Sequence, residues 1–321
     1  MKFTLMRNKI ARNLIWEISF FSGILFFLSF LKKTKAKGII FCYHNLSIES
    51  QSDDVYLVHL NFSIFQKQIL LLRKYFYFTK LSHFFSEMHE LKKPLAVITF
   101  DDGYKGVLEL GFPFLKKLNI PATVFICTDP TLRGVAYPWD LLRRWAALKK
   151  GVEKEFIYKL NSLLLSIPGD KRWKIYKEMF KEKLPEVMQE LRPLYMSVSD
   201  IKCLLSEGWE VGAHTVSHPY LTEIADEQKK AEIAKCKQEL EDLLGIEIPY
   251  FAYPAGRYDQ ITKKMVQDSG YKLAFSLDNK VIFTGDTDMF CVSRVGCGNI
   301  KTKGELYAKA TGIHPYWYRK T

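Results

Sequence analysis

The sequence lacks the cysteine patterns of disulfide-rich and zinc-ribbon proteins. Its 321 residues include six cysteines, and no two of them form a Cys-x-x-Cys pair. Cys42, Cys127 and Cys291 lie in apolar runs, as expected for free thiols in a core. The chain also has no internal repeat, no low-complexity tract and no glycine-rich phosphate loop between a strand and a helix. These absences argue against a disulfide framework and a nucleotide-binding P-loop, and leave a globular chain long enough to bury a substantial core.

Acidic residues are scarce near the N-terminus. The net charge is +12, from 47 Lys and Arg against 35 Asp and Glu. Residues 1–37 alone hold eight Lys or Arg and a single acid, Glu17, which gives +7 and leaves +5 for the remainder. Because this positive charge surrounds an apolar segment, it predicts anionic lipid headgroups as partners and no nucleic acid.

That apolar segment covers residues 14–31, and its eighteen residues approach the length that a bilayer core requires. The sequence therefore predicts that residues 1–37 are a membrane anchor, with a bacterial inner or cell membrane favoured. A cleaved signal peptide is the first alternative, although no small-x-small site precedes Lys32. A helix buried in the soluble domain is the second. Lysines on both flanks leave the orientation and the side of the membrane open.

Two adjacent carboxylates follow an apolar run that has the composition of a buried strand. The run is residues 94–100, and Asp101, Asp102 and Gly103 come directly after it. Successive side chains on an extended backbone point to opposite sides, so one carboxylate is available for a metal and the other for water or substrate. Read alone, the Asp-Asp-Gly sequence is also compatible with a turn that caps a helix.

Two histidines with metal-ligand spacing follow a second short apolar run. His214 and His218 are four residues apart, a spacing that places both imidazoles on one face of a helical turn. Together with one carboxylate they would hold a divalent metal ion with positions left open for water and substrate, as in catalytic sites. Zinc is the favoured ion, with cobalt, manganese or nickel as alternatives.

At these residues the chain resembles the polysaccharide deacetylases, carbohydrate esterase family four, also called the NodB-homology group. The resemblance extends over roughly residues 38–300 and is carried by Thr-Phe-Asp-Asp-Gly at 99–103 and His-Thr-Val-Ser-His at 214–218. It implies that Asp101 is the catalytic base and that Asp102, His214 and His218 hold the metal. It also implies substrate contacts at four positions, namely Tyr104, Tyr253, Pro254 and Ala255, with the Ala255 N–H stabilising the oxyanion.

The chain departs from this family at the residue that would keep the base ionised. Many members carry an arginine two residues before the motif proline, where this sequence has Ala252. Arg294, at another predicted strand end, is a candidate to replace it, and an ordinary surface arginine is the alternative reading. The general acid is also open: the family uses a late histidine, for which His314 is available, and His44 at the end of the first strand is an equal candidate.

Alternating apolar runs and helical patterns predict an α/β fold, an irregular (β/α) barrel of about seven strands with its site at the strands' C-terminal ends. The expected catalytic domain is 38–321. Residues 130–198 interrupt the alternation and predict a helical insertion over the barrel mouth. Three of its tryptophans are candidates to stack on sugar rings, although core packing is the more common role: Trp139, Trp145 and Trp173.

The predicted activity is metal-dependent hydrolysis of the N-acetyl amide of an amino sugar, a C–N bond other than a peptide bond. The expected substrate is a cell-envelope glycan, an exopolysaccharide or a lipid-linked precursor. Deformylation or another amidase reaction on a lipid-linked amino sugar stays open, as do a non-catalytic carbohydrate-binding protein and a membrane interaction protein. Nothing in the sequence indicates the oligomeric state.

Overall fold

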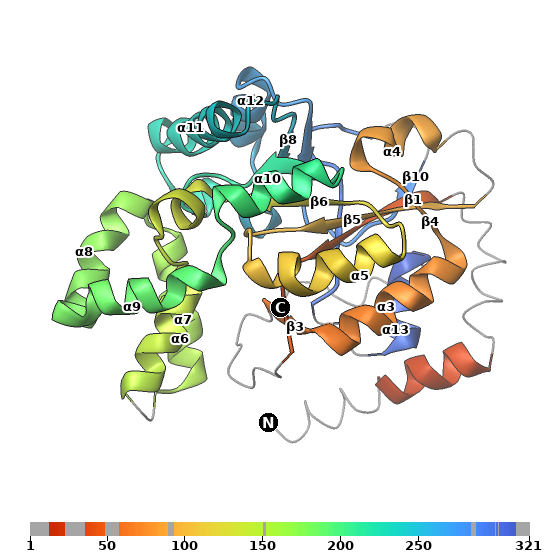
Figure 1. The fold of residues 1–321 in the computed structure, drawn as a ribbon, viewed down its shortest axis with the longest axis horizontal. Coiled ribbons are helices and arrows are strands. Elements are labelled where there is room, and N and C mark those ends of the chain that lie inside the picture. Colours follow the sequence, from red (N-terminus) through yellow and green to blue (C-terminus); the bar gives the residue numbers. More distant parts are fainter. Residues whose placement is uncertain are drawn as a thin grey trace.

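A curled, mostly parallel sheet forms the centre of the molecule (Figure 1). The computed structural model describes residues 13–22, 36–48, 58–88, 93–149, 152–283, 287–298, 300 and 302–312. Within them the sheet has nine strands. In spatial order the main path is β10 (Ile282–Phe283), β1 (Ala36–Tyr43), β5 (Leu95–Phe100), β6 (Ala122–Ile126), β7 (Glu210–Ala213), β8 (Tyr250–Ala252) and β9 (Leu273–Phe275). Two further strands, β4 (Tyr77–Phe78) and β11 (Val295–Gly296), pair with β5 and β1.

The segment 292–296 contacts both ends of the curled parallel array. Val292 forms a parallel bridge with Phe275 of β9, and Val295 of β11 pairs with Phe41 of β1. With β11 included, seven parallel strands follow one another around the curl, as the sequence predicted, although β4 and β10 were not foreseen. The sequence predicted that Arg294 ends a strand, but β11 begins only after it, at Val295. Asp288 accepts hydrogen bonds from the N–H groups of Phe290 and Cys291, and this turn keeps residues 288–291 out of the sheet.

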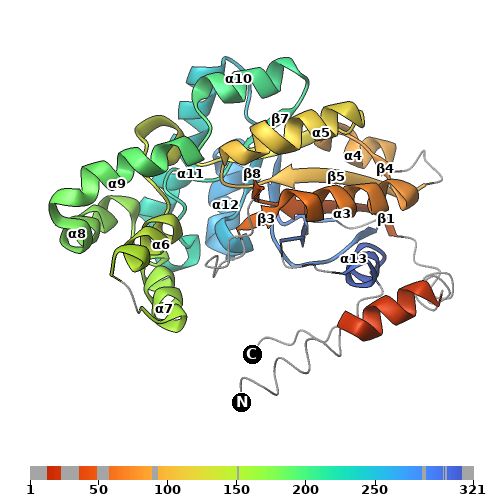
Figure 2. The same ribbon diagram turned by 60° about the horizontal axis from the view of Figure 1, so that its bottom comes forward.

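Helices cover the sheet on both faces, which explains why every residue of β5 is buried (Figures 1 and 2). They are α3 (Phe62–Tyr75), α4 (Leu81–Glu87), α5 (Phe112–Lys117), α10 (Val198–Ser206), α11 (Asp226–Leu244), α12 (Gln260–Asp268) and α13 (Lys303–Ala310). A π-helix, Val107–Gly111, leads into α5. A separate two-stranded sheet joins β2 (Asn45–Ser47) to β3 (His59–Asn61).

The predicted insertion is helical, as expected. It contains α6 (Pro138–Lys149), α7 (Lys154–Leu165), α8 (Gly169–Phe180) and α9 (Leu184–Leu191), which gather on one side of the sheet (Figure 1). These helices bury a hydrophobic cluster of their own, including Leu142, Leu164, Tyr176 and Val187. That cluster also contains Tyr104, so the insertion packs directly on the turn that carries the two aspartates.

Only the first part of the predicted anchor can be compared with the structure. Residues 13–21 form a helix, and residues 23–31 of the apolar segment lie outside the described residues. Among the described residues, no helix has both the length and the apolar character needed to cross a bilayer.

Candidate active site

The two aspartates diverge because the backbone leaves β5 in a left-handed turn. Asp101 continues the strand, and its N–H donates to the carbonyl of Tyr43. Asp102 has φ +72° and Gly103 has φ +65°, so the chain reverses at once. The sequence predicted the divergence from extended backbone, but the left-handed conformation of Asp102 causes it. This conformation is costly for a non-glycine residue, and such strain is common where a side chain must be aimed.

Arg294 makes a two-point ion pair with Asp101. Its Nη1 and Nη2 each lie 2.7 Å from one carboxylate oxygen, and Nη1 also donates to the Thr99 hydroxyl. The arginine side chain is 1% exposed, so the surface alternative was wrong. Burial acts to raise the pKa of Asp101, but the guanidinium and the neighbouring histidines outweigh it and hold this pKa below its usual value. The carboxylate is therefore ionised, and the positive charge that is absent at Ala252 is supplied by the segment that joins β9 to β1.

Asp102, His214 and His218 form a compact, buried group, as the sequence predicted. The Nε2 atoms of His214 and His218 lie 3.6 and 3.5 Å from Oδ1 of Asp102. Burial lowers the pKa of His214 to about 4 and that of His218 well below its usual value, so both rings are neutral lone-pair donors. Oδ1 of Asp102 is buried and has no hydrogen-bond partner among the described residues. One carboxylate and two neutral imidazoles, with an orphaned oxygen between them, fit a divalent metal ion.

The two histidines do not lie on a helical turn, which corrects the sequence prediction. His214 follows β7, and the chain then passes through left-handed backbone at Thr215, φ +73°, and at His218, φ +57°. This irregular loop, 214–218, brings both imidazoles to Asp102. The ring of His214 is fixed by a 2.7 Å hydrogen bond between Nδ1 and the carbonyl of Ala252, which leaves Nε2 facing the group.

Two charged residues, the half-buried Glu232 and the buried Arg172, hold this loop at Ser217. The carboxylate of Glu232, on α11, accepts hydrogen bonds from the N–H groups of Val216 and Ser217 and from the Ser217 hydroxyl. Arg172, on α8 of the insertion, donates from Nη1 to the Ser217 carbonyl over 2.8 Å. The sequence analysis missed both, because neither belongs to a local motif.

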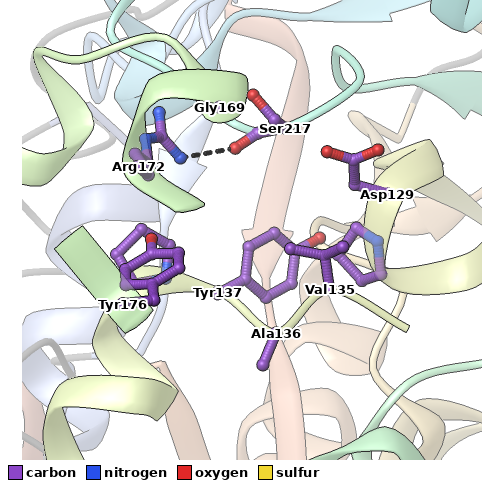
Figure 3. A pocket seen from close by; sticks show the side chains of 10 residues that line it. Asp129, Val135, Ala136, Tyr137, Gly169, Arg172, Tyr176 and Ser217 are labelled. Carbon is purple, nitrogen blue, oxygen red and sulfur yellow. Dashed lines mark hydrogen bonds between the residues drawn. The ribbon is translucent and has the colours of Figure 1, made fainter. Parts of the chain in front are cut away.

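A small cavity adjoins this contact. Its volume is about 20 Å³, and Figure 3 shows Arg172, Tyr176, Tyr137 and Asp129 around it. Nη2 of Arg172 is buried and unpartnered within the described part of the chain. A space of this size holds about one water molecule.

Aromatic residues at the start of α6 pack against the histidine loop. Tyr137 and Trp139 stack with ring centroids 4.5 Å apart, and both meet the His218 ring edge-on. The Tyr137 hydroxyl donates to the carbonyl of Asp102. Trp139 is only 7% exposed, so of its two predicted roles it has the core one; Trp173 is 39% exposed.

Tyr104 does not line the site with its side chain, contrary to the prediction. It is fully buried, and its hydroxyl donates to the carboxylate of Asp140 over 2.6 Å. Tyr195 donates to the same oxygen, and His59 lies 3.5 Å from the other. Asp140 is 1% exposed and was not recognised in the sequence, because a lone aspartate in a helical pattern carries no signal.

The segment after β8 buries its tyrosine and exposes Ala255. Tyr253 is fully buried, with its hydroxyl donating to the Phe290 carbonyl, so its side chain is not exposed for the substrate contact that the resemblance implied. Pro254 is buried as well. Ala255 is exposed and has φ +54°, within the short 3-10 turn Pro254–Gly256.

The two candidate general acids fare differently. His44 is half-buried, and one of its ring nitrogens lies within 4.8 Å of an Asp101 carboxylate oxygen and of the Cys42 sulfur. The Cys42 thiol itself donates to Asp101. His314 lies outside the described residues. The structure therefore brings His44 close to the base Asp101. It gives no position for His314.

The curled parallel sheet with helices on both faces, and a carboxylate–imidazole group at its C-terminal edge, define a (β/α)-barrel protein with a candidate metal centre. The family profile "Polysaccharide deacetylase" matches residues 89–153 and 172–274, more than half of the chain. The chain belongs to the polysaccharide deacetylase family.

Individual relatives are distant. The chain is 22% identical over 207 residues to YxkH of Bacillus subtilis (strain 168), named as a candidate polysaccharide deacetylase; the match covers 64% of this chain and 53% of YxkH. The chain thus spans about half the length of that curated relative. Its fold is similar to the Streptococcus pyogenes deacetylase PplD, solved with acetate, with TM-score 0.57, 18% identity and coverage of 85% of this chain and 97% of PplD. It is also similar to IcaB from Ammonifex degensii, with TM-score 0.57, 20% identity and coverage of 86% and 96%.

Proposed function

We propose that this protein is a metal-dependent deacetylase that hydrolyses the N-acetyl amide of an amino sugar. The substrate would be a cell-envelope glycan, an exopolysaccharide or a lipid-linked precursor, and the protein would act in association with a membrane. The single observation that carries the proposal is the Asp102, His214 and His218 group beside the ionised Asp101–Arg294 pair. Family membership and the acetate bound to PplD support the choice of acyl group.

Asp102, His214 and His218 would hold the ion, with zinc favoured. When bound, a divalent ion supplies Lewis-acid polarisation of the acyl carbonyl and lowers the pKa of water. Asp101, kept ionised by Arg294, accepts the proton of the water that attacks the carbonyl carbon. The Ala255 N–H would donate to the developing oxyanion, and the exposure of this residue supports that role.

The C–N bond then breaks, and the leaving nitrogen needs a proton to depart as an amine. We assign this step to His44, because it is part-exposed and lies within 4.8 Å of the base carboxylate. The products are acetate and a free amino sugar. The reaction consumes one water molecule and needs no oxidant or further co-reactant.

The test is acetate release by the full chain from a panel of N-acetylated glycans and lipid-linked sugars. Enzyme stripped with chelator should be inactive and should recover with Zn²⁺ or Co²⁺. Asp101→Asn should lower kcat by about 10²- to 10⁴-fold while keeping its metal content. Release that survives both the chelator and Asp101→Asn would overturn the metal and the base assignments, and formate release in place of acetate would replace the acyl group.

A further inference from the structure

The helix of residues 13–21 has a docked face built from aromatic residues. The helix, red in Figure 2, lies near α13. Trp16 and Phe20 pack on Tyr307 of α13 and Tyr75 of α3, and the Phe20 and Tyr307 rings lie 5.7 Å apart. Gly304 allows this approach, since a Cβ there would lie 2.1 Å from the Trp16 carbonyl oxygen. The contact is therefore a close helix crossing with a glycine at its centre.

Glu17 ties the same face to α13. Its Oε1 accepts a 2.7 Å hydrogen bond from the N–H of Lys303, the first residue of α13. A carboxylate at a helix N-terminus satisfies an orphan donor and is favoured by the helix dipole. Glu17 is also the only acid in residues 1–37, so the one negative charge of this region points into the protein.

The opposite face is apolar and exposed. Leu14, Ile15, Ile18 and Phe21 are 59%, 61%, 57% and 72% exposed. At 100° per residue these four positions form one stripe, with Trp16 and Phe20 opposite it and Glu17 on its flank. The ammonium of Lys303 lies 5.9 Å from the Phe21 ring, at the edge of this stripe. A contiguous apolar surface of this kind marks an interaction site.

We infer that residues 13–21 lie flat on an anionic lipid surface, with the Leu14, Ile15, Ile18 and Phe21 stripe in the headgroup–acyl boundary and the barrel docked above it. The net charge of +7 in residues 1–37 complements anionic headgroups, and an amphipathic helix with basic flanks binds in this way. Because one face of this helix packs against α13 and α3, only the opposite face can contact lipid. The helix therefore cannot be surrounded on all sides by the bilayer core.

This inference deepens the proposed membrane association and is independent of the reaction. Vesicle binding and acetate release are separate readouts, so the failure of one leaves the other standing. The same charge of +7 would repel a second copy of this helix, which favours lipid over a dimer contact.

The test uses the full chain with an environment-sensitive fluorophore on Ile18→Cys in a Cys203→Ser background. The matched control places the label on Ile261→Cys, 51% exposed on α12. On phosphatidylcholine vesicles containing phosphatidylglycerol, the label at 18 should be quenched more by a nitroxide near the headgroup than by one deep in the acyl chain. The label at 261 should not be quenched. Flotation should show at least about tenfold tighter binding than to phosphatidylcholine alone, weakened by salt.

Three outcomes would overturn the inference. The first is a vesicle-bound protein in which neither nitroxide quenches position 18. The second is deeper quenching by the acyl-chain nitroxide, which would indicate a helix that spans. The third is a dimer by light scattering without vesicles in which position 18 is protected, which would assign the stripe to a second copy.

Discussion

At the scale of single residues, the Asp101–Arg294 pair controls whether the candidate base is charged. Both side chains are almost fully buried, and their geometry is two-pronged. Such a pair adds little to the free energy of unfolding compared with apolar residues of similar shape. The loss of one partner, however, leaves the other as an unpaired buried charge, which is strongly destabilising. A lysine would provide a single point charge and lose the two-point geometry.

Arg294→Met is therefore expected to lower the free energy of unfolding by about 3–5 kcal/mol and to remove activity. Denaturant unfolding at neutral pH measures the first effect. The double variant Asp101→Asn with Arg294→Met should recover part of that stability, because no charge is left unpaired, but not the activity. Additive losses in this cycle would contradict a direct coupling between the two side chains.

Asp140 is the second residue whose ionisation the fold controls. Burial acts against its charge, but the hydrogen bond and charge of His59, followed by Arg143, hold the pKa of this carboxyl below its usual value. Because the folded-state pKa is depressed, the stabilisation is present above the unfolded value of about 4 and is lost as pH falls through the folded value.

At neutral pH, Asp140→Asn should accordingly lower the free energy of unfolding by about 1–3 kcal/mol. On acidification below about pH 4 this variant should lose less stability than the parent protein. Unfolding midpoints across this range make the comparison. Asp170→Asn on the exposed face of α8 is the control, and an equal effect there would refute the assignment.

At the scale of elements, the histidine loop is held by two helices that its own sequence does not reveal. Asp101, Asp102, His214 and His218 could be predicted because their residue types and spacing are local. Glu232 and Arg172 could not, since their partner Ser217 is reached only after α8 and α11 pack. The roles of Tyr104 and Tyr253 were misjudged for the same reason: burial is set by neighbours distant in sequence.

The contact from α11 gives a prediction for this loop. Glu232→Gln keeps the size of the side chain but weakens its hydrogen bonds to residues 216 and 217, so metal affinity should fall by about 10- to 100-fold. Competition with a chelator measures it. Glu227→Gln, exposed on the same helix, should bind metal like the parent, and equal affinities for all three proteins would show that the carboxylate does not hold the loop.

At the scale of the whole molecule, the N-terminal segment is part of the folded structure and not only an appendage. The barrel and its seven-strand curl were predictable from alternating patterns, whereas the docking of residues 13–21 was not, because an apolar run reads alike whether lipid or protein covers it. The pairing of Glu17 with Lys303 and the contacts of Trp16 and Phe20 with α13 distinguish the two.

Phe20→Ala should therefore lower the free energy of unfolding in the absence of any membrane. The expected loss is about 2–4 kcal/mol, since a half-buried ring contributes somewhat less than a core phenylalanine. Thermal unfolding in detergent-free buffer is the measurement. Phe21→Ala, whose ring is 72% exposed, is the neighbouring control and should change the midpoint little. Equal midpoints for the two variants would contradict the docking.

The position of Arg294 in the chain sets the order in which this site is assembled during synthesis. Asp101 and Asp102 emerge from the ribosome early, both histidines much later, and the arginine later still, on the segment that contacts both β9 and β1. A nascent chain that extends through β9 already contains the base and the ligand set but not the counter-charge. The Asp101–Arg294 pair thus forms only when β11, the last parallel strand, is added. A translation product truncated before Arg294 therefore lacks the charge that keeps the buried Asp101 ionised.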